Sequence, residues 1–199
     1  MEAVDARLLA EPRYGDNCWV QPTSASDSVL SAALADLARG RLQALDAIWD
    51  AIASDLFGLA LWRTGSRNDA EEAVQEVFVR LARSAGRLPA IARPRAYLLT
   101  MAHRAAVDVV RRRRPGEPLD SAVELLAPAL DPGRAADAER ASHLFLQLPP
   151  KHREVVHLKH FVDLSFAEIG QVIGVPTFTA ASRYRLAIRR LRELMGVEP

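Results

Sequence analysis

Arginine side chains gather at two places in this chain, and their chemistry suits nucleic acid. Four consecutive arginines occupy residues 111–114, and five more precede the first acid of the C-terminal segment: Arg183, Arg185, Arg189, Arg190 and Arg192. The guanidinium group is a planar fork of donors that matches phosphate oxygens and the guanine edge. Both segments are therefore candidate nucleic-acid contacts, although a solvated helix face shows the same pattern and a GC-rich genome also enriches arginine.

The segment that carries the second arginine group has the pattern of a helix-turn-helix. Pro149 and Pro150 mark a break and a helix start. Ser165 and Glu168 have the spacing of a capping box that opens the next helix, and Gly174 ends that helix. The last helix then carries an apolar stripe on one side and arginines on the other. Such a helix can pack through one face and enter a DNA major groove with the other.

The elements upstream are also predicted to be helices. Apolar residues recur at helical spacing in four segments, which are residues 27–40, 41–64, 69–83 and 94–113. Asp69 and Glu72 resemble a capping box at the start of the third segment. Trp49 and Trp62 lie at helical spacing with aliphatic residues in the second segment, which is typical of core side chains.

No stretch alternates polar and apolar residues over the length of a strand, so the predicted fold is all-α. We expect two small helical domains joined by a flexible linker. The expected organisation is a flexible N-terminal extension (residues 1–26), a first domain (27–114), an acidic linker rich in Pro (115–136) and a helix-turn-helix domain (137–199).

Composition excludes several classes of function. The 199 residues have a net charge of only +1, so basic charge is local. Cys18 is the single cysteine, which rules out an internal disulfide and a thiolate zinc site. His157 and His160 lie one turn apart, but nothing completes a metal set, and ordinary histidines are the simpler interpretation. With no catalytic motif we expect no enzyme, no cofactor and no metal, and with no signal or membrane segment we expect a cytoplasmic protein.

Three segments in register resemble the extracytoplasmic-function (ECF) sigma factors of bacterial RNA polymerase. DAEEAVQEVFVRL (69–81) and RAYLLTMAHRAAVDVVRRRR (95–114) are similar to the helices of sigma region 2. The segment that begins LPPKHREVV at residue 148 is similar to region 4. The resemblance covers roughly residues 42–194 and leaves the N-terminal extension unmatched. It implies that region 2 and region 4 form the two domains.

The resemblance also implies roles for particular residues. In this family the first of these helices docks on core RNA polymerase, which assigns that role to Asp69, Glu72, Gln75 and Glu76. The next loop and helix melt and bind the minus-ten promoter element, which assigns Arg87, Arg95, Tyr97, Thr100, His103, Arg104 and Arg111. The recognition helix binds the minus-thirty-five element, which assigns Thr177, Phe178, Thr179, Ser182, Arg183 and Arg185. Catalytic residues and metal ligands are not expected.

Three positions depart from the family pattern. Arg104 stands where an Asn is frequent, Pro176 where a capping Ser is usual, and Ala181 where a Lys is usual. Thr177 is expected to take over the cap of the last helix. Loss of the lysine removes one phosphate contact. Together the departures indicate either a divergent subgroup or weaker DNA contact that is offset elsewhere in the chain.

Two other classes of protein fit the same sequence less well. One is a stand-alone helix-turn-helix transcriptional regulator, and the other is an interaction module that binds polymerase without reading promoters. The acid and amide side chains of residues 69–76 favour the sigma factor over the stand-alone regulator. The partners expected from the resemblance are core RNA polymerase, promoter DNA and an anti-sigma factor, with no insertion into a membrane.

Overall fold

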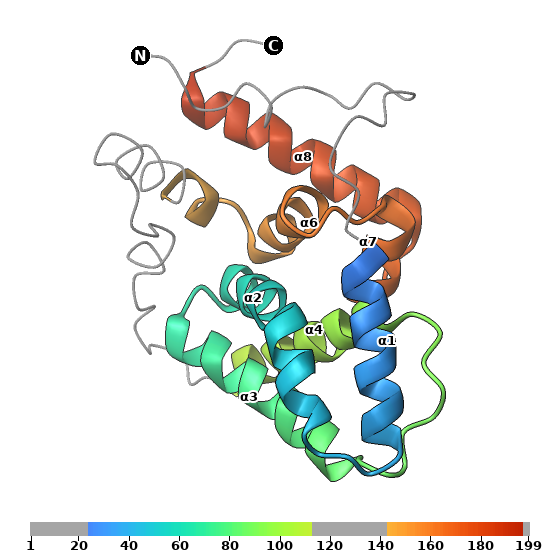
Figure 1. The fold of residues 1–199 in the computed structure, drawn as a ribbon. Coiled ribbons are helices and arrows are strands. Elements are labelled where there is room, and N and C mark those ends of the chain that lie inside the picture. Colours follow the sequence, from blue (N-terminus) through green and yellow to red (C-terminus); the bar gives the residue numbers. More distant parts are fainter. Residues whose placement is uncertain (1–23, 113–142, 197–199) are drawn as a thin grey trace, which may run out of the picture.

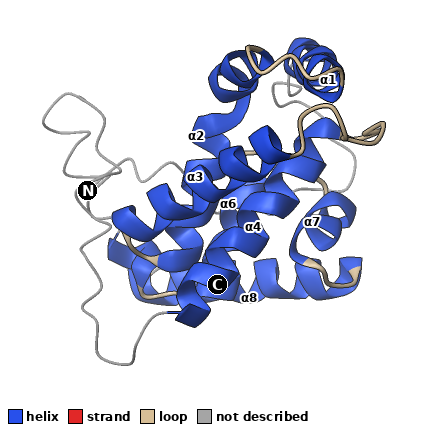
Figure 2. Cartoon of the chain, turned by 90° about the horizontal axis from the view of Figure 1, so that it is seen from below, coloured by secondary structure: helices blue, strands red, loops and turns tan. Residues whose placement is uncertain are grey.

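The computed structural model describes residues 24–112 and 143–196, and every regular element in these ranges is a helix (Figures 1 and 2). The helices are α1 (Ser24–Ala38), α2 (Ala44–Thr64), α3 (Arg67–Arg83), α4 (Pro94–Arg112), α6 (Pro150–His160), α7 (Phe166–Ile173) and α8 (Thr177–Met195). No helix in the described part of the chain is both long enough and apolar enough to cross a membrane. The predicted all-α fold is confirmed. Helix α1 begins at Ser24, inside the extension expected over residues 1–26, while the rest of that extension and the linker lie outside the described residues.

Helix α2 is the centre of the front half of the molecule, which comprises α1–α4. It packs against α1, α3 and α4, and Ile48, Ile52, Leu56 and Leu59 are fully buried or nearly so along it. This spacing of three or four residues produces the continuous apolar stripe that a bundle needs. Gly65 ends the helix with a positive φ of 72° and donates its N–H to the Leu61 carbonyl.

The N-cap of helix α3 lies three residues earlier than the sequence suggested. Ser66 is its N-cap, and the Ser66 hydroxyl accepts the Asp69 N–H at 3.4 Å. The prediction that Asp69 caps the helix is therefore wrong. Asp69 instead lies in the first turn, where a carboxylate is favourable because the free N–H groups leave this end of the helix positive.

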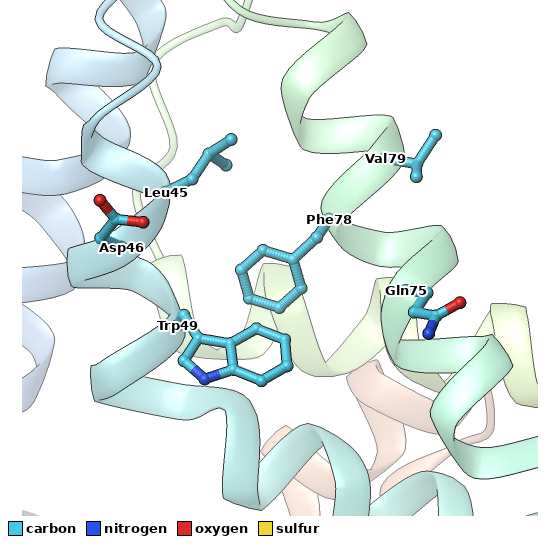
Figure 3. Close-up of a pocket in the computed structure, with 6 residues that line it drawn as sticks. All are labelled: Leu45, Asp46, Trp49, Gln75, Phe78 and Val79. Carbon is cyan, nitrogen blue, oxygen red and sulfur yellow. The ribbon is translucent and has the colours of Figure 1, made fainter. Parts of the chain in front are cut away.

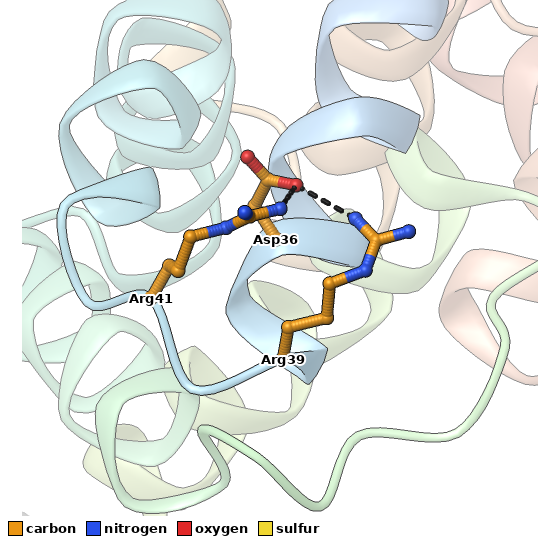
Figure 4. Close-up of polar contacts among 3 residues, drawn as sticks. All are labelled: Asp36, Arg39 and Arg41. Carbon is orange, nitrogen blue, oxygen red and sulfur yellow. Dashed lines mark hydrogen bonds and ion pairs between the residues drawn. The ribbon is translucent and has the colours of Figure 1, made fainter.

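The turn between α1 and α2 is held by a small charged cluster (Figure 4). One carboxylate oxygen of Asp36 accepts from both Arg39, at 2.9 Å, and Arg41. Gly86, in the loop between α3 and α4, donates its N–H to the Leu37 carbonyl at 2.9 Å. The Gly86 bond ties the start of that loop to the end of α1.

The rear half, α6–α8, is a helix-turn-helix preceded by one further helix. The predicted capping box is present: the Glu168 N–H donates to the Ser165 hydroxyl, and the Ser165 N–H donates back to the Glu168 carboxylate. Gly174 has φ 70° and ends α7. Gly170 is required inside α7, since a Cβ there would lie 2.6 Å from the Val175 carbonyl oxygen. The sharp turn into α8 depends on both glycines.

The two halves pack against each other. In Figure 1, α6 lies between α8 and α2, and it contacts both; α7 contacts α4. Trp62 of α2 and Phe145, just before α6, have ring centroids 5.3 Å apart, and both side chains are buried. Helix α6 approaches α2 closely at Gly58, where a Cβ would meet the His157 imidazole at 2.6 Å. The described residues therefore share one hydrophobic core.

Candidate functional site

The polar face of α3 carries the four residues predicted to bind polymerase. Glu72 and Gln75 are exposed, whereas Asp69 and Glu76 are partly covered. Glu72 pairs with Arg112 of α4 at 2.6 Å, and Glu76 accepts from Arg80 at 2.7 Å. The hydrogen bond from Arg80 holds the pKa of Glu76 below its ordinary value. The four side chains thus form a polar face on a single helix, and Glu72 and Gln75 are its most accessible members.

An apolar groove that the sequence did not predict lies beside this polar face (Figure 3). It runs between α2 and α3 and is lined by Leu45, Asp46, Trp49, Gln75, Phe78 and Val79. The Trp49 and Phe78 rings contact each other, with centroids 4.9 Å apart. Trp49 is 50% exposed, so the prediction that it belongs to the core is wrong. Gln75 belongs to both surfaces and makes them continuous.

The seven residues predicted for the minus-ten element differ in how accessible they are. Arg87, Arg104 and Arg111 are exposed. Arg95 is engaged with Asp55 of α2 at 2.8 Å, and the Thr100 hydroxyl donates to the Ala96 carbonyl of its own helix. Tyr97 is half-buried against the core, and His103 faces the rear half of the molecule.

The recognition helix α8 exposes three of the six residues in its predicted contact set. Thr177, Phe178 and Arg185 are exposed, and the Phe178 ring is 74% exposed although it is apolar. Thr179 and Ser182 are partly covered. The opposite face packs through Ala180, Tyr184 and Ala187, and the Tyr184 hydroxyl is 2.8 Å from His160 Nε2. The helix begins without a side-chain cap at Pro176, so the prediction that Thr177 caps it is wrong.

The last predicted contact, Arg183, belongs to a buried polar cluster between the two halves. Its Nη1 lies 4.0 Å from Oε1 of Glu154, which is 2% exposed. Glu154 Oε2 lies 3.3 Å from His103 Nδ1 and 3.6 Å from Arg63 Nε. Sequence reasoning missed this cluster; the available signal was a charged residue, Glu154, directly before the apolar pair Val155 and Val156 of α6.

The surroundings of the α6 histidines indicate a structural role. The His157 ring is buried and stacks with Phe161 at a centroid distance of 5.4 Å. Burial lowers the pKa of His157 to about 4, so its imidazole is neutral at pH 7. Within residues 24–112 and 143–196, no group of three His, Cys, Asp or Glu side chains could hold a metal ion.

Comparison with known families matches each half of the chain separately. Sigma-70 region 2 matches residues 48–115, and sigma-70 region 4 matches residues 144–193. The first match covers most of α2, α3 and α4, and the second covers α6, α7 and nearly all of α8. These two regions define a sigma-70-type protein, which acts with RNA polymerase in transcription initiation.

Individual relatives show to which group of sigma-70-type proteins the chain belongs. ECF RNA polymerase sigma factor SigK of Mycobacterium ulcerans is 32% identical over 182 residues, which are 87% of this chain and 97% of SigK. ECF RNA polymerase sigma factor SigL of Mycobacterium tuberculosis is 32% identical over 157 residues, 73% of this chain and 85% of SigL. The chain therefore belongs to the ECF sigma factors.

A solved structure has the same fold. CnrH, determined in complex with the cytosolic domain of CnrY, aligns with a TM-score of 0.62 at 20% identity. The alignment covers 87% of this chain and 99% of CnrH. The match therefore extends over both helical halves.

Proposed function

We propose that this sigma factor directs initiation at promoters that carry two separate elements. The front half docks on core polymerase and melts the minus-ten element, and the rear half binds the minus-thirty-five element. The observation that carries this proposal is the exposed side of the first half of α8, where Thr177, Phe178 and Arg185 are accessible on a helix whose other face is buried. This is the division of faces that a major-groove helix requires.

The polymerase-docking surface consists of the polar face of α3 together with the apolar groove beside it. Glu72 and Gln75 offer charge and hydrogen bonding, while Trp49 and Phe78 offer an aromatic anchor. Protein interfaces commonly combine such an aromatic centre with a polar rim. The groove therefore extends the predicted contact set from α3 to α2.

The minus-ten surface consists of the loop at residues 84–93 and the accessible side of α4. Arg87, Arg104 and Arg111 supply exposed cations for phosphates. Tyr97 is partly exposed on the same helix and can stack on an unpaired base. His103 and Arg95 have partners within the protein, so they contribute to DNA binding only after those contacts break.

Control by an anti-sigma factor is part of the proposal. The related fold of CnrH was determined with the cytosolic domain of CnrY bound. A protein of that kind would compete with polymerase for the surface formed by α2 and α3. We therefore expect this chain to be held inactive by a dedicated partner until a signal releases it.

The test uses the full chain, core RNA polymerase and a promoter library with both elements randomised. Phe178→Ala or Arg185→Ala should lower initiation from promoters selected for their upstream element and leave polymerase affinity unchanged. Losing one phosphate contact by Arg185→Ala should also reduce the salt slope of promoter binding by about one. Arg189→Ala is the matched control, since Arg189 is an exposed arginine of α8 outside the predicted set.

Two results would contradict the proposal. Initiation that does not depend on either promoter element would show that the two halves do not recognise these elements. Tight binding of the isolated chain to duplex DNA, with no affinity for polymerase, would identify a stand-alone regulator instead.

A further inference from the structure

Phe178 exposes a larger fraction of its surface, 74%, than any other bulky apolar side chain in the described part of the chain. A single apolar residue at a protein surface is common and needs no explanation by itself. Phe178 differs because it is the second residue of α8, the helix assigned to the minus-thirty-five element. Its exposure therefore falls where the proposed function places DNA.

The packing of α8 leaves Phe178 outside the hydrophobic core. Helices α6 and α7 contact α8, and its buried side includes Ala180, Tyr184 and Ala187. At about 100° per residue, Phe178 lies roughly on the opposite side of the helix, and it is not among the side chains that pack against the core. The ring thus contributes little to folding, and its apolar surface is available to a ligand.

The side of α8 that carries Phe178 is otherwise cationic. Arg185 follows two turns later and within about 20° of the same direction, and Arg189 follows one turn after that; both are exposed. The small residues Ala181 and Ser182 lie between the ring and the first arginine, so a partner can approach the helix closely. An apolar protein surface would have to take the guanidinium groups out of water, which is costly. DNA meets them with phosphates, so this side of the helix suits DNA.

Thymine is the base that offers an apolar group in the major groove. Its C5 methyl group lies at the base edge, whereas the other bases are distinguished there by hydrogen-bond donors and acceptors. Recognition helices place their N-terminal residues against base edges, and Phe178 is at that end of α8. Because a phenyl ring is neither a conventional donor nor a conventional acceptor, contact with this methyl group is the base-specific interaction that suits it.

We propose that Phe178 is a specificity-determining residue that selects thymine in the minus-thirty-five element through the C5 methyl group. Arg185, on the same side of α8, contacts a phosphate or a guanine in the same groove. Seven residues span about 10 Å of helix, so the two contacts fall about three base pairs apart where the helix follows the groove. The inference rests on the proposed function and adds the base and the chemical group that one position recognises.

The test uses holoenzyme assembled from the full chain and core RNA polymerase. Its DNA is a duplex promoter that the holoenzyme selects from a library randomised in the minus-thirty-five element. Each thymine of that element is replaced in turn by 2′-deoxyuridine, which lacks the C5 methyl group but pairs with adenine in the same way. At one thymine the replacement should weaken promoter binding about fourfold, the value of one buried methyl-sized group.

Three variants then show which side chain contacts that methyl group. Phe178→Ala should make the thymine and deoxyuridine probes bind equally, while Phe178→Leu keeps an apolar side chain and should retain most of the difference. Leu186→Ala is the matched control, since Leu186 is a partly exposed apolar residue of the same helix, and the difference should persist. Far-UV circular dichroism and affinity for core polymerase should be unchanged in all three, because both positions are exposed.

A gain of affinity provides the converse test. 5-Methylcytosine carries its methyl group at the same ring position as thymine, so it places that group at the same base edge. A probe with cytosine at the contact position should therefore bind about fourfold more tightly once that cytosine is methylated. Phe178→Ala should abolish this gain.

The possible failures are distinguishable. A selected element without thymine, methyl sensitivity at no thymine, or sensitivity that survives Phe178→Ala would overturn the inference and leave the two-element function intact. Loss of polymerase affinity in Phe178→Ala, with unchanged base preference, would show that the ring contacts a protein surface instead. If wild-type holoenzyme initiates irrespective of the minus-thirty-five sequence, the proposed function fails and this inference fails with it.

Discussion

Trp49 is the residue that most strongly indicates a docking surface. An indole buries a large apolar area when covered, yet half of this one is exposed. It is held in place by the Phe78 ring, so it is ordered before a partner arrives. A preordered aromatic loses little conformational freedom on binding, which favours affinity.

Replacing Trp49 by alanine should therefore weaken polymerase binding much more than folding. We expect a loss of about 2 kcal/mol in binding, roughly thirtyfold, as for a central aromatic anchor. Equilibrium binding to core polymerase measures the first effect, and urea unfolding measures the second. Leu42→Ala is the control, because Leu42 is 52% exposed but lies outside the groove. Equal effects of the two substitutions on binding would exclude the groove from the docking surface.

Residue types and spacing predicted the surfaces of single helices but not the contacts between distant ones. Glu72, Phe178 and Arg185 were expected to be accessible, and they are. His103 and Arg183 were expected to face DNA, yet both face Glu154. Helical periodicity fixes which side of one helix is polar. It carries no information about which polar sides of two helices will meet.

Among the helices, an end was predictable where a side chain and the backbone form reciprocal hydrogen bonds. Ser165 and Glu168 satisfy each other's groups, and the sequence pattern identified them. The start of α3 was placed wrongly because Ser66 and Asp69 are both good caps, and only the backbone conformation decides between them. The sequence did not predict that residue 170 must be glycine. A side chain there is excluded by the Val175 carbonyl oxygen across the turn, which the helical pattern does not reveal.

The capping box should contribute measurably to the stability of the rear half. Ser165→Ala removes the acceptor for the Glu168 N–H and should cost about 1 kcal/mol, which lowers Tm by about 2–4 °C. Thr177→Ala is the matched control, because α8 has no side-chain cap and should lose little. Calorimetry of both variants makes the comparison. A larger loss for Thr177→Ala would show that the cap assignments of α7 and α8 are reversed.

At the scale of the whole molecule, the packing of the two halves lay beyond what the sequence could predict. The sequence indicated two domains because proline, glycine and acidic residues separate two helical patterns. The contacts that join them depend on Trp62 meeting Phe145 and on Gly58 meeting His157. Each of these residues has an ordinary explanation within its own helix. Only the three-dimensional arrangement shows that both pairs join the front half to the rear half.

This packing predicts a dependence of stability on acid. Burial lowers the pKa of His157 from its ordinary value of 6.5 to about 4. Between these values the unfolded chain binds a proton that the folded chain excludes, so stability falls as the pH decreases from about 6.5 to about 4. The loss should approach about 3 kcal/mol at the acid end, and above pH 7 the contribution of His157 should be constant.

Urea unfolding of the full chain at a series of pH values measures this effect. His152 and His160 also have pKa values lowered by burial, so they add to the acid dependence. The variant His157→Asn keeps a small polar side chain but cannot titrate, and the difference between the two profiles isolates His157. The wild-type curve should fall more steeply below pH 6.5, and the two curves should run parallel above it. Parallel curves over the whole range would show that the imidazole at the Gly58 contact is accessible to protons, and hence that the halves are not closed in solution.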